Sequence, residues 1–111
     1  MNKLLIPVDF SIHSDKAIEY AVQLAQKSNH AIDLLHVFTD HSNIYQNALT
    51  DPELIDPRVP ETKQKMKVLI DRIQDVLPEV QLNAIYVDGN LYDEVSRLAV
   101  KEDYDAILMG T

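Results

Sequence analysis

The sequence predicts an α/β fold built on a doubly wound, open parallel sheet. Two observations support this prediction: short apolar runs alternate with longer segments whose apolar residues recur at helical spacing, and the resulting order is βαβαβαβ. Strands separated by helices pair in parallel through right-handed crossovers, which cover both faces of the sheet. The length of 111 residues suits one domain, so a single domain is expected over residues 1–111.

The first half of the chain predicts two strands with a helix between them. Residues 4–8 form a nearly continuous apolar run, as expected for a strand buried on both faces. The helix is expected at Asp15–Lys27, with Ser14 as its N-cap and an acidic residue near the positive end of the helix dipole. Ala31–Phe38 is a second apolar run and predicts the second strand.

The second half continues the alternation. A helix is expected at Pro60–Leu77, because one apolar stripe runs along this segment and Pro78 stops it. Val80–Val87 predicts the third strand. Asn90 caps a further helix, and Ala106–Met109 predicts a short fourth strand.

Residues 39–59 form the one long segment without a predicted strand or long helix. A connection of this length is uncommon in a compact domain and indicates either a lid or a short element that the pattern does not reveal. Asp51–Ile55 can supply one helical turn, with Asp51 as cap and Pro52 at the first position. Whether the segment closes over a ligand or packs on a partner is left open.

The composition excludes several classes of partner. The chain has 18 acidic and 10 basic residues and a net charge of -8, so nucleic acid and anionic membrane surfaces are not expected to bind. No apolar run approaches the roughly 20 residues of a membrane span, and Pro7 and Asp9 interrupt the first run before a signal peptide could form. Without cysteine there is no disulfide and no Cys-based zinc site, and we expect a cytoplasmic protein.

The topology also predicts where a ligand would bind. In open parallel sheets, ligands lie beyond the carboxyl ends of strands, where the strand order reverses. The candidate segments follow the four strands: Asp9–Ser11, Val37–Asp40, Asp88 with Gly89, and Met109–Thr111. The two glycines of the chain, Gly89 and Gly110, are too few for a Walker loop or a dinucleotide fingerprint.

The sequence predicts no catalytic or metal site. Ser11 and Ser14 fit helix caps better than nucleophiles, because His13 is the one histidine near them and no histidine–acid pair is identifiable. His36 and His41 could form a metal pair with Asp40, but the spacing from strand to loop does not define their geometry. We therefore expect a protein that is not an enzyme.

Four stretches resemble the corresponding stretches of universal stress protein domains, in order and with family-like spacing. They are LLIPVDFSIHSDKAIEYAVQLAQ, IDLLHVF, VDGNLYDEVSRLAV and YDAILMGT. The resemblance implies a five-stranded sheet of the adenine nucleotide α-hydrolase type, of which four strands are expected here, so the domain is expected to be C-terminally incomplete. Family members commonly dimerise, and some bind ATP whereas others do not.

In the ATP-binding members, the fourth strand leads into a phosphate loop of pattern G-x-x-G-x9-G-[S/T], and this chain stops at Thr111, where that loop should begin. The resemblance therefore implies ATP as a possible cofactor that this chain holds weakly. Asp9 would line the nucleoside site, where its carboxylate can accept hydrogen bonds from ribose hydroxyls or hold a metal with its phosphates, unless it only shapes the turn. Val37 would lie near the adenine. The implied nucleoside site consists of Pro7, Asp9, Val37, Met109 and Gly110.

Three functions remain as alternatives. The first is a non-enzymatic, nucleotide-linked stress or regulatory domain of the universal stress protein type, and the second is a dimerising interaction module that does not bind ATP. The third is an ATP-using enzyme of the related α-hydrolase group, which fits worst, because the loop S-G-G-x-D-S of that group is replaced by the glycine-free Asp9–Ser14.

A homodimer or higher homo-oligomer is the expected assembly. A chain that stops at Thr111 leaves its fourth strand as an exposed edge with unpaired backbone groups. It also lacks a helix that would cover apolar surface beside Leu5, Ile107 and Met109. Burial against a second copy would protect both.

Overall fold

The computed structural model describes residues 3–39 and 58–109 and has the predicted α/β architecture. Within these residues, a parallel four-stranded sheet has the order β3-β2-β1-β4. The elements in chain order are β1 (Lys3–Pro7), α1 (Ile12–Ser28), β2 (Ala31–Phe38), α3 (Arg58–Val76), β3 (Leu82–Asp88), α4 (Leu91–Lys101) and β4 (Ala106–Ile107).

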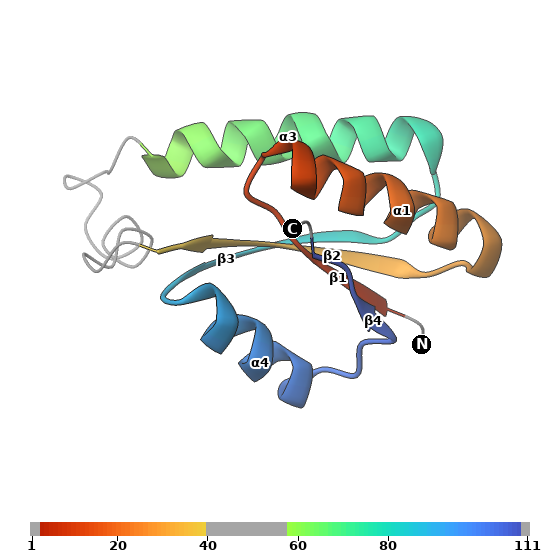
Figure 1. The fold of residues 1–111 in the computed structure, drawn as a ribbon. Coiled ribbons are helices and arrows are strands. Elements are labelled where there is room, and N and C mark those ends of the chain that lie inside the picture. Colours follow the sequence, from red (N-terminus) through yellow and green to blue (C-terminus); the bar gives the residue numbers. More distant parts are fainter. Residues whose placement is uncertain (1–2, 40–57, 110–111) are drawn as a thin grey trace.

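The sheet is doubly wound about its first strand. The chain moves outward from β1 through β2 to β3, and it then returns to pair β4 with the free side of β1. Helices α1 and α3 cover one face of the sheet and α4 covers the other (Figure 1). The strand order therefore reverses between β1 and β4, which is where a ligand is expected in such a sheet.

Alternate residues of β1 and β2 fill two cores, one on each face. Leu4 and Ile6 pack with Ile18 and Met66 of the covering helices in the larger core. Leu5 packs in the smaller core beneath α4, with Leu35, Val37 and Leu98. This double burial explains the continuous apolar runs of the two strands.

The smaller core side also holds a buried carboxylate. Asp33 of β2 is 5% exposed. Its Oδ2 accepts a hydrogen bond from the Tyr104 hydroxyl at 2.7 Å, and its Oδ1 accepts one from the Asn83 side chain at 3.1 Å. Both carboxylate oxygens are therefore satisfied, as a buried charge requires.

The start of α1 corrects one sequence prediction. The N-cap is Ser11, which has an extended backbone conformation and whose side-chain oxygen accepts a hydrogen bond from the Ser14 amide at 3.2 Å. Ser14 is instead a buried residue of the first turn. The prediction that Ser14 caps the helix was therefore wrong. The physical reason is Phe10, which adopts a left-handed φ of 62° and turns the chain into the helix directly after Asp9.

Other element ends differ by a few residues from the predictions. The first two helical residues of α3, Arg58 and Val59, fall in the segment predicted as loop. The fourth strand has two paired residues instead of four, although the Leu108 amide still donates to the Leu5 carbonyl at 2.9 Å. The predicted turn at Asp51–Ile55 lies outside the described residues.

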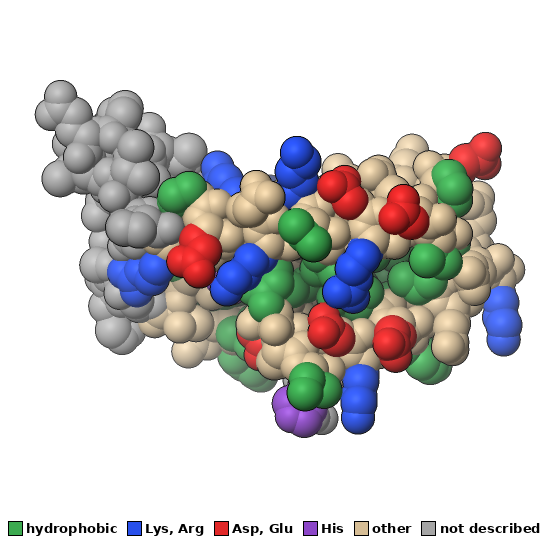
Figure 2. Space-filling model, turned by 90° about the horizontal axis from the view of Figure 1, so that it is seen from above, with side chains coloured by type: hydrophobic (Ala, Val, Ile, Leu, Met, Phe, Trp, Pro, Cys, Tyr) green, Lys and Arg blue, Asp and Glu red, His purple; other side chains and the backbone are tan. Residues whose placement is uncertain are grey.

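The surface over α1 and α3 carries charges of both signs. Figure 2 looks down on these helices and shows acidic and basic side chains interspersed, with hydrophobic side chains between them. Within residues 3–39 and 58–109, no helix is both long enough and apolar enough to cross a membrane.

Candidate functional site

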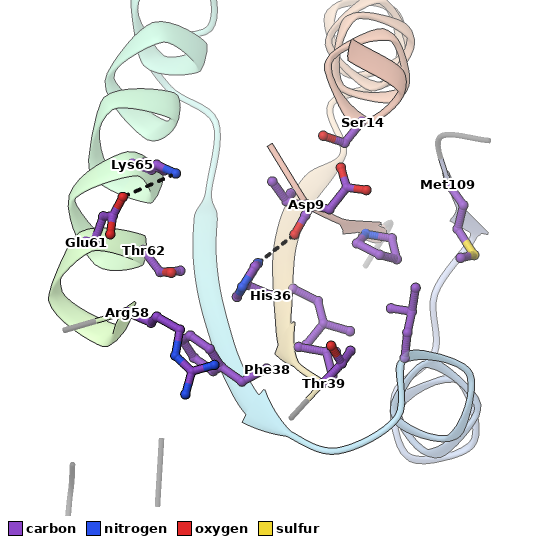
Figure 3. Close-up of a pocket in the computed structure, with 15 residues that line it drawn as sticks. Asp9, Ser14, His36, Phe38, Thr39, Arg58, Glu61, Thr62, Lys65 and Met109 are labelled. Atoms are coloured by element: carbon purple, nitrogen blue, oxygen red, sulfur yellow. Dashed lines mark hydrogen bonds and ion pairs between the residues drawn. The ribbon is translucent and has the colours of Figure 1, made fainter. Parts of the chain in front are cut away.

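A cavity of about 520 Å³ lies at the carboxyl edge of the sheet. It receives residues from the ends of β1 and β2, from the helices around them and from the segment after β4 (Figure 3). Its lining consists of Pro7, Val8, Asp9, Ser14, Leu35, His36, Val37, Phe38, Thr39, Arg58, Glu61, Thr62, Lys65, Leu91 and Met109.

Four of the five residues predicted for a nucleoside site line this one cavity. Pro7 and Asp9 come from the end of β1, Val37 from β2, and Met109 from the segment after β4. The fifth, Gly110, lies outside the described residues. The parallel arrangement brings the first four together because it places the carboxyl ends of neighbouring strands at the same edge. Their role in binding stays a prediction.

Asp9 presents a charged carboxylate at the mouth of the cavity. Its Oδ1 accepts a hydrogen bond from the Ser11 amide at 2.9 Å. Hydrogen bonding from the Ser11 side chain and then from its backbone lowers the Asp9 pKa below the ordinary value. Asp9 is therefore ionised at neutral pH and can accept hydrogen bonds from hydroxyl groups of a ligand.

His36 was not predicted as part of a nucleoside site, yet it lines the cavity. Its Nδ1 lies 2.8 Å from the Val8 carbonyl oxygen. The ring stands 5.4 Å from the Phe10 ring and 4.9 Å from the Phe38 ring, measured between centroids. One signal in the sequence could have indicated His36. It directly precedes Val37, and at the end of a strand the side chains on both faces of the sheet reach the same cavity.

The alternative metal pair of His36 and His41 with Asp40 has no structural test, because Asp40 and His41 lie outside the described residues. Among the residues that the structure describes, no group of three histidine, aspartate or glutamate side chains is placed to hold a metal ion. We assign no metal centre to this cavity.

Helix α3 supplies a polar wall that the sequence analysis did not assign to a site. Arg58, Glu61, Thr62 and Lys65 recur three or four residues apart, so they share the helix face that Figure 3 shows beside the cavity. Lys65 Nζ lies 3.7 Å from a Glu61 carboxylate oxygen and 5.7 Å from the Phe10 ring centroid. This exposed ion pair is weak, and a ligand can compete with it.

The cavity thus has two kinds of wall. Pro7, Val37, Leu91 and Met109 give it apolar surface, whereas Asp9 and the α3 residues give it polar groups of both charges. Its volume lies within the range of roughly 300–1,000 Å³ that is typical of small-molecule sites. The arrangement suits an organic molecule with a flat apolar part and hydrogen-bonding edges.

A second, shallower hollow of about 410 Å³ lies between α1 and β4. It is lined by His13, Lys16, Ala17, Tyr20, Ile107, Leu108 and Met109. Tyr20 is 56% exposed and Met109 is 45% exposed, in agreement with the expectation of bare apolar surface near Met109. Leu5, in contrast, is fully buried in the core beneath α4, so the expectation of bare surface beside Leu5 is corrected at that residue.

Solved structures of known proteins share this fold. The hypothetical protein MJ0577, whose structure served for a structure-based assignment of biochemical function, is 27% identical with a TM-score of 0.77, and the match covers 97% of this chain and 73% of that one. The universal stress protein UspA from Lactobacillus plantarum is 23% identical with a TM-score of 0.72, over 99% of this chain and 79% of that one.

A third match is a protein of the universal stress protein family from Burkholderia pseudomallei, which is 19% identical with a TM-score of 0.65, over 99% of this chain and 81% of that one. These last two likenesses show the fold alone. A comparison with curated proteins finds no matching relative. The model of the universal stress protein family matches residues 1–111, the full length of the sequence. The chain therefore belongs to the universal stress protein family.

Proposed function

We propose that this chain is a nucleotide-linked, non-enzymatic regulatory domain whose cavity at the strand-order reversal takes an adenine nucleoside or nucleotide. One observation carries the proposal: Pro7, Asp9, Val37 and Met109, which the family resemblance implies around a nucleoside, line a single cavity of about 520 Å³. The cavity lies where doubly wound sheets bind their ligands.

The chemistry of the lining supports a nucleoside. The apolar surface of Val37 and Met109 suits the faces of a flat base, which gains from leaving water. The ionised Asp9 carboxylate can accept hydrogen bonds from the two ribose hydroxyls. A ligand with both features would use both walls of the cavity.

The proposed absence of catalysis rests on the serine hydroxyls beside the site. The Ser14 hydroxyl donates to the Ser11 carbonyl at 3.1 Å, and the Ser11 hydroxyl oxygen accepts from the Ser14 amide. Both hydroxyls thus take part in the turn that starts α1, where they also hydrogen-bond the ionised Asp9 carboxylate. Among the described residues, no histidine is hydrogen-bonded to either serine as a base that would activate it. A cytoplasmic location and a homo-oligomeric state stay predictions.

Calorimetric titration of the chain with adenosine tests the proposal. Asp9→Ala should weaken adenosine binding by about 10- to 150-fold, because a hydrogen bond to a charged group is worth roughly 1.5–3 kcal/mol. Asp71→Ala is the matched control, since this exposed carboxylate of α3 does not line the cavity. Unchanged affinity in the Asp9 variant would contradict its assigned role. If neither adenosine nor ATP binds the unmodified chain, the interaction module replaces the nucleotide-linked domain.

A further inference from the structure

We infer that His36 determines the specificity of the cavity: its Nε2 is a hydrogen-bond acceptor that selects purines with an amino group at position 6 over purines without a donor there. The inference rests on the proposed function, in that the cavity must take a purine nucleoside. It adds a residue and a chemical criterion to that site, because Asp9 is assigned to the ribose hydroxyls and the other predicted nucleoside-site residues have no hydrogen-bonding side chain.

The hydrogen bond to Val8 sets the tautomer of the ring. A carbonyl oxygen can only accept, so the Nδ1 atom that lies 2.8 Å from the Val8 oxygen must carry the proton. In the neutral imidazole the other nitrogen, Nε2, then holds a lone pair and no proton. His36 therefore offers an acceptor on the side of the ring that faces away from Val8.

The surroundings hold the ring in this orientation. Phe38 contacts it edge to face, with an interplanar angle of 79°, and Phe10 covers it at a tilt of 34°. Aromatic pairs at such separations are attractive. The Val8 amide also donates a hydrogen bond to the Leu35 carbonyl at 2.7 Å. The Val8 carbonyl, which accepts from Nδ1, therefore belongs to a residue that is hydrogen-bonded to β2. The packing fixes the plane of the ring, and a reversal of the ring within that plane would give up the hydrogen bond to Val8.

The acceptor remains accessible from the cavity. His36 is half-buried and lines the cavity, where Figure 3 shows it between Asp9 and the α3 side chains such as Thr62. Within the described part of the chain, no hydrogen bond to Nε2 is formed, and no buried side-chain nitrogen or oxygen lacks a partner. Nε2 is therefore hydrated in the free protein and would lose that water to a bound base.

This loss makes the acceptor selective. A ligand that displaces the water and brings an N–H donor restores the hydrogen bond, whereas a ligand without a donor leaves a desolvated lone pair. Sites built around one hydrogen bond reject analogues that lack the partner group. The 6-amino group of adenine is such a donor, purine riboside has hydrogen at that position, and inosine has an acceptor oxygen.

Calorimetric titration with adenosine, purine riboside and inosine measures this selectivity. The unmodified chain should bind adenosine about tenfold or more tightly than purine riboside or inosine. His36→Asn keeps an amide nitrogen near the Nδ1 position, which can still donate to Val8, but it has no atom at the position of Nε2. It should bind adenosine and purine riboside equally well. His13→Asn, in the exposed first turn of α1, is the control and should keep the full ratio.

The outcomes separate the two proposals. A folded His36→Asn protein that retains the adenosine preference shows that His36 only ties β1 to β2, and the inference is then overturned while the nucleoside site stands. Unmodified protein that binds no purine nucleoside overturns both.

Nitrogen-15 spectra of the unmodified protein give a readout without a variant. The His36 Nε2 signal should be that of an unprotonated nitrogen, and it should shift with adenosine but not with purine riboside. An Nε2 signal from a protonated nitrogen in the neutral ring would contradict the inference.

Discussion

The hydrogen bond between Tyr104 and Asp33 should contribute a large part of the stability of the sheet. Tyr104→Phe removes one oxygen atom and leaves the packing of the ring in place. The Asp33 carboxylate, which is 5% exposed, would then keep the Asn83 bond at 3.1 Å and lose the 2.7 Å bond to the hydroxyl. An unsatisfied buried acceptor that is charged costs about 1.5–3 kcal/mol.

The size of this loss can be measured by urea unfolding followed by circular dichroism. Thermal unfolding followed by the same signal should show a decrease in Tm of roughly 6–24 °C, which corresponds to about 1.5–3 kcal/mol for a domain of about 100 residues. Tyr92→Phe is the matched control, because Tyr92 on α4 is 78% exposed and its hydroxyl lies in solvent. A loss below about 0.5 kcal/mol for Tyr104→Phe, similar to that of the control, would refute the reasoning.

The same bond predicts how stability changes at alkaline pH. Burial, followed by the hydrogen bond to Asp33 and the charges of Asp33 and Glu102, raises the pKa of Tyr104 well above its ordinary value of 10.0. The folded chain therefore holds this proton more tightly than the unfolded chain. Its contribution is complete below about pH 10 and is lost as the pH rises above that value. The stability difference between the unmodified protein and Tyr104→Phe should decrease over the same range.

Three further predictions concern the helix cap, the nucleotide and the assembly. Ser11→Ala should lower the free energy of unfolding by about 0.5–2 kcal/mol, because it removes the N-cap of α1. Denaturant titration measures this loss, and the control Ser96→Ala within α4 should show a smaller one. The 111-residue chain should bind ATP no tighter than about 0.2 mM, because its two glycines are too few for a glycine-rich phosphate loop, and a micromolar site without two phosphate contacts of about 1.5–3 kcal/mol each is weakened at least that far. Calorimetry that gives low-micromolar affinity would contradict this. The chain should self-associate through exposed apolar side chains such as Tyr20 and Met109 beside β4, so a sedimentation coefficient that stays monomeric up to high micromolar concentration would count against it.

Much of the fold could be predicted because it depends on local patterns. The apolar runs of β1 and β2 reflect burial on both faces, and the alternation of strands with helices implies the parallel order that brings Pro7, Asp9, Val37 and Met109 to one edge. These predictions needed only the sequence periodicity, the sheet rules and the family resemblance.

The remaining features depend on contacts that a local pattern does not contain. The role proposed for His36 depends on a hydrogen bond to a carbonyl 28 positions away in the sequence. The left-handed backbone conformation of residue 10 could not be predicted, because this position holds Phe and not Gly. Ser11 and Ser14 both suit an N-cap, so the sequence alone did not decide which of them begins the helix. The α3 wall depends on how the helix is rotated about its axis, which its packing on the sheet decides.

Because the pairing of β4 is short, the cavity walls differ in the free energy needed to open them locally. Two residue pairs join β4 to β1, Leu4 with Ala106 and Leu5 with Ile107, whereas β1 and β2 are joined by five pairs from Lys3 with Ala31 to Pro7 with Leu35. Segments with few backbone hydrogen bonds open locally at lower free energy than the central strands. The Met109 wall should therefore detach and reclose while the β1–β2 pair stays intact. Local opening at this corner would give a ligand of the proposed site a route of entry and exit that leaves Asp9, His36 and Val37 in place.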